Sequence, residues 1–222
     1  MSPMTRNRSI GNAPNELVAT YYRQRAGAGL IVTEGTSPSP NGLGYPRIPG
    51  LFRPDQVAGW KAVAEAVHGA GGRIFAQLMH TGRIGHPENL PAGAEVVAPS
   101  AVAARGEIWT DTKRLQPHPT PRALSSEEVA ATVAEFARAA ANAVEAGLDG
   151  VEIHGANGYL VDQFLNPTEN RRDDAWGGDA ERRNRFAVEV AEACAAAIGA
   201  DRVGIRLSPY GVFNDLAPFD GI

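Results

Sequence analysis

Four short apolar runs recur along the chain, and segments with the periodicity of amphipathic helices lie between them. The runs are Leu30 to Gly35, Arg73 to Leu78, Gly150 to Gly155 and Arg202 to Ser208. Their hydrophobic residues are continuous rather than alternating with polar ones, which is typical of parallel strands covered on both faces. The pattern therefore predicts four strands of a parallel sheet.

The segments between the runs predict helices. From Ser125, a capping box with Glu128 precedes apolar residues at helical spacing, and Gly147 ends the segment. Three further stripes of this kind predict helices over about residues 14–27, 57–72 and 186–199. Cys194 falls on the apolar face of the last one, so we expect it in the core.

Strands that alternate with helices define the α/β class, as either an open doubly wound sheet or a (β/α)8 barrel. An open sheet that binds a dinucleotide would carry G-x-G-x-x-G after its first strand, and the sequence has no such motif. Polar residues instead follow the carboxyl ends of the apolar runs, where barrel enzymes place their active sites. We therefore predict an α/β fold of the (β/α)8 TIM barrel type.

We expect a single domain over residues 1–222 that forms only part of such a barrel. Four strands are evident, so the expected barrel is incomplete and lacks most of strand 1 and the last βα units. Residues 1–4 are the candidate remnant of that first strand. A stretch at about 79–124, rich in Pro, Gly and His, interrupts the rhythm, and we interpret it as a long loop insertion that serves as a lid or a binding loop.

The composition limits the partners and the setting. The 222 residues are 43% hydrophobic with a formal net charge of −4, so a basic surface for nucleic acid is not expected. We expect neither export nor membrane insertion, because no stretch has the required apolar length. The single cysteine excludes an internal disulfide and favours a reduced, cytoplasmic setting. The composition is compatible with a homo-oligomer.

The parity of the third predicted strand divides its side chains between two faces. Glu152 and His154 share one face, while Val151 and Ile153 point toward the helices. Glu152 lies one pleat deeper in the barrel than His154, where we expect it to pair with an arginine.

Polar residues at the ends of three strands are expected to meet. The same parity turns Gln77 and Arg206 toward the barrel axis beside His154, and Asn157 follows three residues after that histidine. Tyr159 is protonated at neutral pH, because a phenol has an unperturbed pKa near 10, and it can give up a proton. Donors with one cation and no strong nucleophile stabilise negative charge on a bound molecule that brings its own reactivity.

Other barrel chemistries fit these residues less well. The only lysines, Lys61 and Lys113, fall in a helix and in the long loop, so we expect no Schiff base at a strand end. The H-x-H spacing common in metal-dependent hydrolases is absent and no metal site is predicted, although His80 and His154 leave such a hydrolase as a weaker alternative. Glycoside hydrolysis would need two facing carboxyl groups at the rim.

Seven motifs in register along nearly the whole chain resemble the Old Yellow Enzyme family of flavin ene-reductases. They are PMTRNRS (3–9), YYRQRAGAGLIVTEGT (21–36), AQLMHTGR (76–83), APSAV (98–102), IHGANGYLVDQFLNP (153–167), NRRDDAWGG (170–178) and VGIRLSP (203–209). The resemblance implies an FMN-dependent oxidoreductase, an NAD(P)H-dependent flavin ene-reductase. It would take hydride from NADPH or NADH and reduce the activated C=C bond of α,β-unsaturated carbonyl or nitro compounds by a ping-pong mechanism.

The resemblance also implies roles for individual residues. Those implied to bind FMN are Pro3, Met4, Thr5, Gly35, Gln77 and Arg206. Within this set, Thr5 would bond the flavin near O4 and N5, Gln77 would hold the pyrimidine edge, and Arg206 would sit near N1 and O2.

For the substrate, the implied catalytic residues are His154, Asn157 and Tyr159. His154 and Asn157 would bind the carbonyl oxygen of a small electrophilic alkene, and Tyr159 would donate the proton. Tyr45 would line the substrate pocket.

The chain departs from the family pattern in ways that alter these expectations. Asn157 stands where some members have a second histidine, so we expect any pH dependence of ligand binding near neutrality to come from His154. Met79 replaces an aromatic residue common in relatives, which changes the shape of the pocket. Asp179 replaces a serine, and either residue can cap a helix. The family holds the flavin phosphate in later loops, so an inactive barrel fragment unable to retain FMN is the alternative hypothesis.

Overall fold

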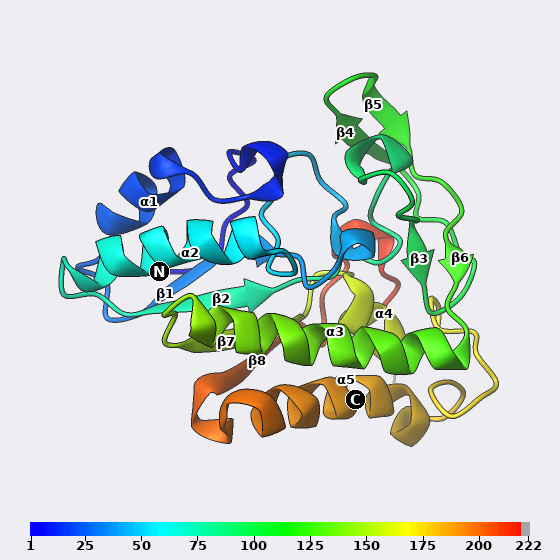
Figure 1. The fold of residues 1–222 in the computed structure, drawn as a ribbon. Coiled ribbons are helices and arrows are strands. Elements are labelled where there is room, and N and C mark those ends of the chain that lie inside the picture. Colours follow the sequence, from blue (N-terminus) through cyan, green and yellow to red (C-terminus); the bar gives the residue numbers. More distant parts are fainter. Residues whose placement is uncertain (219–222) are drawn as a thin grey trace.

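Four parallel strands form the main sheet of the computed structural model, which describes residues 1–218 (Figure 1). The strands are β1 (Ile31–Thr36), β2 (Ile74–Leu78), β7 (Gly150–Gly155) and β8 (Val203–Leu207), and they lie where the apolar runs predict them. Their order in the sheet is β1-β2-β7-β8, so each new strand is added to the same edge. A doubly wound sheet reverses direction at a switch point, whereas this sheet winds in one direction as a barrel does.

The predicted helices are present with small changes in their bounds. They are α1 (Glu16–Arg23), α2 (Pro54–His68), α3 (Ser126–Glu145) and α5 (Ala180–Ile198), and a shorter helix, α4 (Leu160–Leu165), follows β7. Helix α1 ends earlier than expected, because the glycines at 27 and 29 and the turn before them cannot sustain a helix. Short 3-10 turns lie at Ile10–Asn12, Pro40–Gly42, Pro87–Asn89, Ala200–Arg202 and Phe213–Asp215.

Side-chain caps fix where two of the helices begin. At α3 the predicted capping box is present, since the Ser125 side chain accepts from the Glu128 amide and the Glu128 carboxylate accepts from the Ser125 amide. At α5 the Asp179 carboxylate accepts from the Arg182 amide at 3.0 Å, so aspartate does cap this helix.

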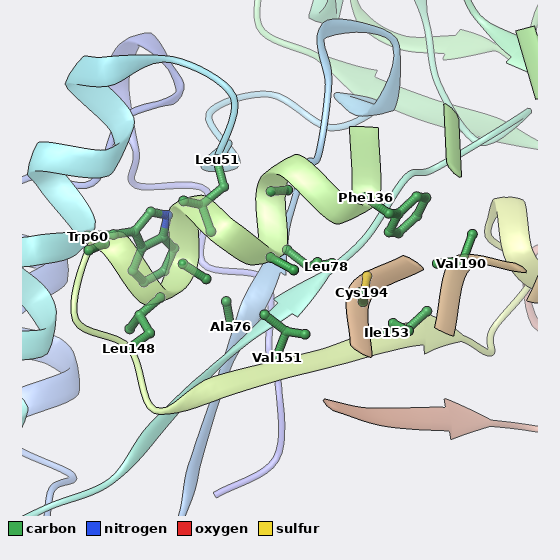
Figure 2. Packing of buried hydrophobic residues seen from close by; sticks show 14 of the residues in the cluster. Leu51, Trp60, Ala76, Leu78, Phe136, Leu148, Val151, Ile153, Val190 and Cys194 are labelled. Carbon is green, nitrogen blue, oxygen red and sulfur yellow. The ribbon is translucent and has the colours of Figure 1, made fainter. Parts of the chain in front are cut away.

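The hydrophobic core lies between the sheet and the helices (Figure 2). Its fully buried members include Trp60 of α2, Phe136 of α3 and Cys194 of α5, together with Val151 and Ile153 of β7. The predicted burial of Cys194 and the predicted outward direction of Val151 and Ile153 are therefore confirmed. Burial of these side chains is the main favourable term that holds the helices to the sheet.

The excursion between β2 and α3 is more ordered than the expected loop. It carries an antiparallel hairpin of β4 (Glu107–Thr110) and β5 (Arg114–Pro117), and a parallel pair of β3 (Val97–Ala98) and β6 (Arg122–Ala123). The hairpin projects from the rest of the molecule in Figure 1. The sequence did not reveal these strands within the insertion, because their hydrophobic pattern is too brief to read.

The amino-terminal residues do not form a strand. Met1 nevertheless lies along β1, since its amino group donates to the Leu30 carbonyl at 2.6 Å and its own carbonyl accepts from the Val32 amide at 3.1 Å. Because these two bonds fix Met1 beside β1, the residues that follow, 2–5, lie at the carboxyl ends of the strands.

Candidate active site

One pocket of about 200 Å³ opens at the carboxyl ends of the four parallel strands. Each strand contributes one residue to it, namely Gly35 from β1, Gln77 from β2, His154 from β7 and Arg206 from β8. The complete lining is Ser2, Pro3, Met4, Thr5, Gly35, Gln77, Met79, His154, Asn157, Tyr159 and Arg206. The structure thus brings together every site residue expected from the sequence except Tyr45, which lies just behind the pocket.

A carboxylate beneath the pocket holds two of its polar residues. Glu152 accepts from Arg206 Nε at 2.9 Å and from Arg206 Nη2 at 3.0 Å, and Gln77 Nε2 donates to the same carboxylate at 2.8 Å. The expected pairing of Glu152 with an arginine is confirmed. The bidentate pair fixes the plane of the guanidinium group. It uses Nε and Nη2, so Arg206 Nη1 has no partner among residues 1–218, and neither has Gln77 Oε1. Both atoms are therefore available to a ligand in the pocket.

His154 lies at the inner wall of the pocket and is only 5% exposed. Burial lowers the pKa of His154 to about 4. The nearby Glu152 carboxylate opposes this shift, and Arg206 adds a smaller lowering. The imidazole is therefore neutral at pH 7 and has one N–H to donate. A pKa this low moves the titration of His154 below the neutral range, and the sequence does not reveal the desolvation that causes it.

Two tyrosines meet beside His154. The Tyr159 ring packs edge-on against the His154 ring, with centroids 4.9 Å apart, and its hydroxyl lies 3.2 Å from the Tyr45 hydroxyl. Burial raises the pKa of Tyr159, and burial also raises the pKa of Tyr45. Both phenols consequently keep their protons well above neutral pH, and either one can donate to the other.

The opposite wall is apolar. Met79 packs so closely on Gly35 that a β-carbon at that position would overlap the methionine side chain. Glycine at this position therefore lets the flexible Met79 side chain lie directly against the strand. Pro3 and Met4 extend this apolar surface, and Met4 is half exposed at its edge.

Other functional constellations are weak in the part of the chain that the structure describes. Within residues 1–218, no group of three or more His, Cys, Asp or Glu side chains is arranged to hold a metal ion. His80 is buried away from such partners, and burial lowers its pKa to about 3. The same residues include no helix that is both long enough and apolar enough to cross a membrane.

Sequence reasoning did not find the residues that support the site. Ser2 lines the pocket. The side chains of four further residues bind the backbone of Asn157 and Gly158, namely Asp162, Gln163, Ser208 and Asn214. These four lie in a short helix and in the loop after β8, and no periodic pattern distinguishes them. Three of them, Asp162, Gln163 and Ser208, lie within the family motifs at 153–167 and 203–209, and this was the signal that could have drawn attention to them.

Taken together, the winding of the sheet and the pocket at its carboxyl edge define an α/β protein of the barrel type with a ligand site at the strand ends. A sequence profile of the NADH:flavin oxidoreductase / NADH oxidase family matches residues 1–219. The chain therefore belongs to this family, and its resemblance to the Old Yellow Enzyme family is confirmed.

Individual relatives agree with this assignment. The chain is 44% identical to 12-oxophytodienoate reductase 7 of Oryza sativa subsp. japonica, over 94% of this chain and 54% of that protein. It is also 44% identical to a probable flavin mononucleotide-dependent alkene reductase of Leishmania infantum, over 99% of this chain and 62% of that protein. Among solved structures, morphinone reductase in complex with tetrahydroNAD superposes with a TM-score of 0.96 at 45% identity, over 99% of this chain and 62% of that one.

Two facts follow from these comparisons. The predicted (β/α)8 barrel class is confirmed by structural likeness at high identity. The chain spans about 54% to 62% of the length of these relatives, so it represents part of the barrel found in them.

The pocket fits the flavin that the family description implies. Its donor and acceptor set, Arg206 Nη1 with Gln77 Oε1, suits a ring edge that carries both carbonyl oxygens and an N–H group. The apolar wall of Met79 and Pro3 suits the face of a flat aromatic ring.

Proposed function

We propose that this protein is an FMN-dependent ene-reductase that takes hydride from NADPH or NADH and reduces activated C=C bonds in small electrophilic alkenes. The single observation that carries the proposal is the convergence on one pocket of two groups of residues. His154, Asn157 and Tyr159 form one group, and Gln77 and Arg206 form the other. The first suits an oxygen that gains negative charge, and the second suits a flavin edge.

Flavin binding is assigned to residues from both ends of the described chain. When bound, FMN would accept hydride from the nicotinamide and return it to the β-carbon of the alkene, which gives a ping-pong sequence. Arg206 would stabilise negative charge at one edge of the ring, and Gln77 would bond the neighbouring atoms. The other residues assigned to the ring are Pro3, Met4, Thr5 and Gly35.

The substrate oxygen is assigned to His154 and Asn157. The side-chain amide of Asn157 makes no hydrogen bond within residues 1–218 and lines the pocket, so it can donate to a carbonyl or nitro oxygen. Neutral His154 supplies a second donor. Two preset donors stabilise the charge that moves onto the oxygen as hydride reaches the β-carbon, and this is the step they accelerate.

Tyr159 is assigned as the proton donor to the α-carbon. Its hydroxyl is protonated at neutral pH, and the neighbouring Tyr45 hydroxyl at 3.2 Å can relay a proton from solvent to restore it. Tyr45 is also assigned to the wall of the substrate site, which the two phenol rings would share.

The names of the relatives support the reductant and the substrate class. The nicotinamide analogue in the morphinone reductase complex supports NADH or NADPH as the hydride source, and the alkene reductase of Leishmania infantum supports an activated alkene. The single, buried cysteine supports our proposal of a cytoplasmic protein. A homo-oligomer stays a prediction, for which size-exclusion chromatography with light scattering is the test.

The first experiment asks for bound flavin and two half-reactions. The purified protein, mixed with FMN and desalted, is expected to stay yellow, to bleach anaerobically with NADPH, and to regain its colour when 2-cyclohexenone is added. A colourless protein that releases all FMN would favour the alternative of a chain unable to retain the cofactor. A protein that bleaches but does not recover with the enone would contradict the assigned substrate class.

A second experiment separates the proton donor from the oxygen donors. We expect Tyr159→Phe to bind FMN as the wild type does and to lower the rate of enone reduction about 10²-fold or more, within the usual range for loss of a general acid. Tyr21→Phe is the matched control, because Tyr21 lies outside the pocket. Equal enone rates in the wild type and Tyr159→Phe would exclude this role for Tyr159.

A further inference from the structure

The turn that carries two of the pocket residues is bonded in an unusual way. Asn157 and Gly158 both have left-handed backbone angles, with φ of 59° and 75°. Asparagine tolerates this conformation and glycine favours it, but such a turn takes its residues out of any helix or strand ladder. The four backbone polar groups of the pair therefore need partners from elsewhere.

Side chains of four other residues supply all of those partners. The Asn157 amide donates to Ser208 Oγ at 2.9 Å, and the Asn157 carbonyl accepts from Asn214 Nδ2 at 2.8 Å. The Gly158 amide donates to the Asp162 carboxylate at 2.9 Å, and the Gly158 carbonyl accepts from Gln163 Nε2 at 2.7 Å. Each group thus has its own partner, and the peptide planes on both sides of Gly158 are fixed in orientation.

The partners are themselves held in place. Gln163 is fully buried, and its Oε1 accepts from the Arg83 amide at 3.1 Å. The Arg83 guanidinium donates to the Asp215 carbonyl at 2.9 Å, next to Asn214 in the chain, and pairs with Glu169 at 3.3 Å. Through Arg83, these contacts connect the loop after β8 to helix α4. The turn is therefore held by the loop on one side and by the helix on the other.

The turn has no room to shift toward that loop. A β-carbon at Gly158 would lie 2.8 Å from the Phe213 carbonyl oxygen and 2.9 Å from Asn214 Cβ. Only this one residue separates Asn157 from Tyr159, and both line the pocket. Any displacement of the turn would therefore move the assigned oxygen donor and the assigned proton donor together, relative to His154 on β7.

We propose that Asp162, Gln163, Ser208 and Asn214 are positioning residues that hold the Asn157–Gly158 turn for the reaction. The proposal rests on the proposed function, because it assigns the turn a task in enone reduction. Misplacement of a reacting group by about 1 Å lowers rates strongly, so catalysis should depend on this grip more than folding does.

Ser208→Ala is the first test, because it removes the acceptor of the Asn157 amide, and with it the longer bond of 3.4 Å from Ser208 Oγ to Asp162, without adding bulk. We expect the enone-dependent reoxidation of the reduced flavin to become at least about 10-fold slower. Reoxidation by 1,4-benzoquinone, which needs no proton at carbon, should slow clearly less than reoxidation by the enone, and FMN affinity measured by flavin fluorescence should change less than about twofold. Ser208→Thr keeps the hydroxyl and should restore most of the enone rate.

Amide hydrogen exchange tests the grip without reference to activity. In Ser208→Ala we expect a peptide covering residues 156–160 to exchange about 10-fold faster than in the wild type, because the Asn157 amide loses its acceptor. Ser126→Ala is the matched control, since Ser126 is exposed at the start of α3. If Ser208→Ala does not fold, Asn214→Gly replaces it, because glycine retains the left-handed angles found at this position.

The outcomes separate the two hypotheses. If the wild type fails to reduce the enone, the proposed function is wrong, and the exchange experiment still decides whether the four side chains hold the turn. If the wild type reduces the enone, and Ser208→Ala matches Ser126→Ala in both enone rate and exchange, the positioning role is overturned. An equal loss of the enone and quinone rates would also overturn it, because that result indicates general damage to the site.

Discussion

The two faces of strand β7 show how one short segment serves both stability and chemistry. Val151 and Ile153 are fully buried among the helices, whereas Glu152 and His154 alternate with them and face the strand-end site. The apolar face contributes free energy of folding through burial. The polar face contributes less free energy of folding, because burial leaves His154 Nδ1 without a hydrogen-bond partner and an unpaired buried polar atom is destabilising.

This difference indicates that the polar residues at the strand ends are explained better by the proposed ligand than by the stability of the fold. Glu152 is compensated by Arg206 and Gln77, so the polar face is tolerated but not strongly favourable. Substitutions on the two faces should accordingly have opposite profiles. Substitutions on the apolar face should lower stability with little effect on the site. Substitutions on the polar face should impair the site with a smaller effect on stability.

The largest expected effect is on the apolar face. Ile153→Ala should lower the free energy of unfolding by about 2–5 kcal/mol, because it leaves a cavity between β7 and the helices. Denaturant unfolding at a fixed FMN concentration measures it, and Ile153→Val, with a cost of about 0.5–1.5 kcal/mol, is the graded control. The folded fraction should bind 4-chlorophenol, a probe whose oxygen would occupy the site assigned to His154 and Asn157, as the wild type does. A loss of phenol affinity without a loss of stability would break the comparison.

The next effect is a pH dependence of stability on the polar face. The pKa of His154 falls from its ordinary 6.5 to about 4 in the folded protein, so between these values the unfolded chain binds more protons than the native one. The contribution of His154 to the free energy of unfolding is therefore fully present above pH 6.5 and decreases as the pH falls toward 4. The loss amounts to up to about 3 kcal/mol.

The measurement is the difference in unfolding free energy between the wild type and His154→Gln at several pH values. Taking this difference removes the contributions of other buried groups, such as Glu34, whose pKa burial raises to about 7. The wild type should lose stability relative to the variant on acidification. Parallel curves from pH 7 to pH 4 would show that His154 is not buried in its neutral form.

A smaller loss is expected where the charge on the polar face is compensated. Arg206→Met should lower stability by about 1–2 kcal/mol, less than for a fully buried pair, because the arginine side chain is 39% exposed. It should also weaken FMN binding, which fluorescence titration measures. Arg202→Met, at an exposed arginine just before β8, is the control. Unchanged FMN affinity in Arg206→Met would contradict the assignment of Arg206 to the flavin.

The smallest effect concerns the amide of Asn157. Asn157→Gly deletes the side chain and keeps a residue suited to the left-handed angles, so stability should change by less than about 1 kcal/mol. The affinity for 4-chlorophenol should fall about 10-fold, equivalent to about 1.4 kcal/mol, through loss of one hydrogen bond. Spectral titration of the flavin complex measures it, and an unchanged dissociation constant would remove Asn157 from the oxygen site.

Much of this arrangement could be predicted from the sequence. The continuous apolar runs determine where β1, β2, β7 and β8 lie, and strand parity correctly separates Val151 and Ile153 from Glu152 and His154. The roles assigned to the pocket residues came from the family resemblance and remain proposals, although the structure gathers nearly all of these residues around one pocket.

The remaining features depend on tertiary contacts that leave no periodic trace. The pKa of His154 follows from burial by distant segments, and the hairpin of β4 and β5 rests on strands too short to give a pattern. The bonds from Ser208 and Asn214 to Asn157 join residues about 50 positions apart. None of these could be inferred from local sequence.

The central claim is that the polar face of β7 acts on the substrate and contributes little to stability. The most direct measurement compares His154→Ala with the wild type in anaerobic stopped-flow reoxidation of the reduced flavin by 2-cyclohexenone. We predict a rate at least about 10-fold lower for the variant, within the range for loss of one preset donor, with flavin content and unfolding free energy at pH 7 not reduced. An unchanged reoxidation rate, or a lower rate explained entirely by unfolding, would contradict the account.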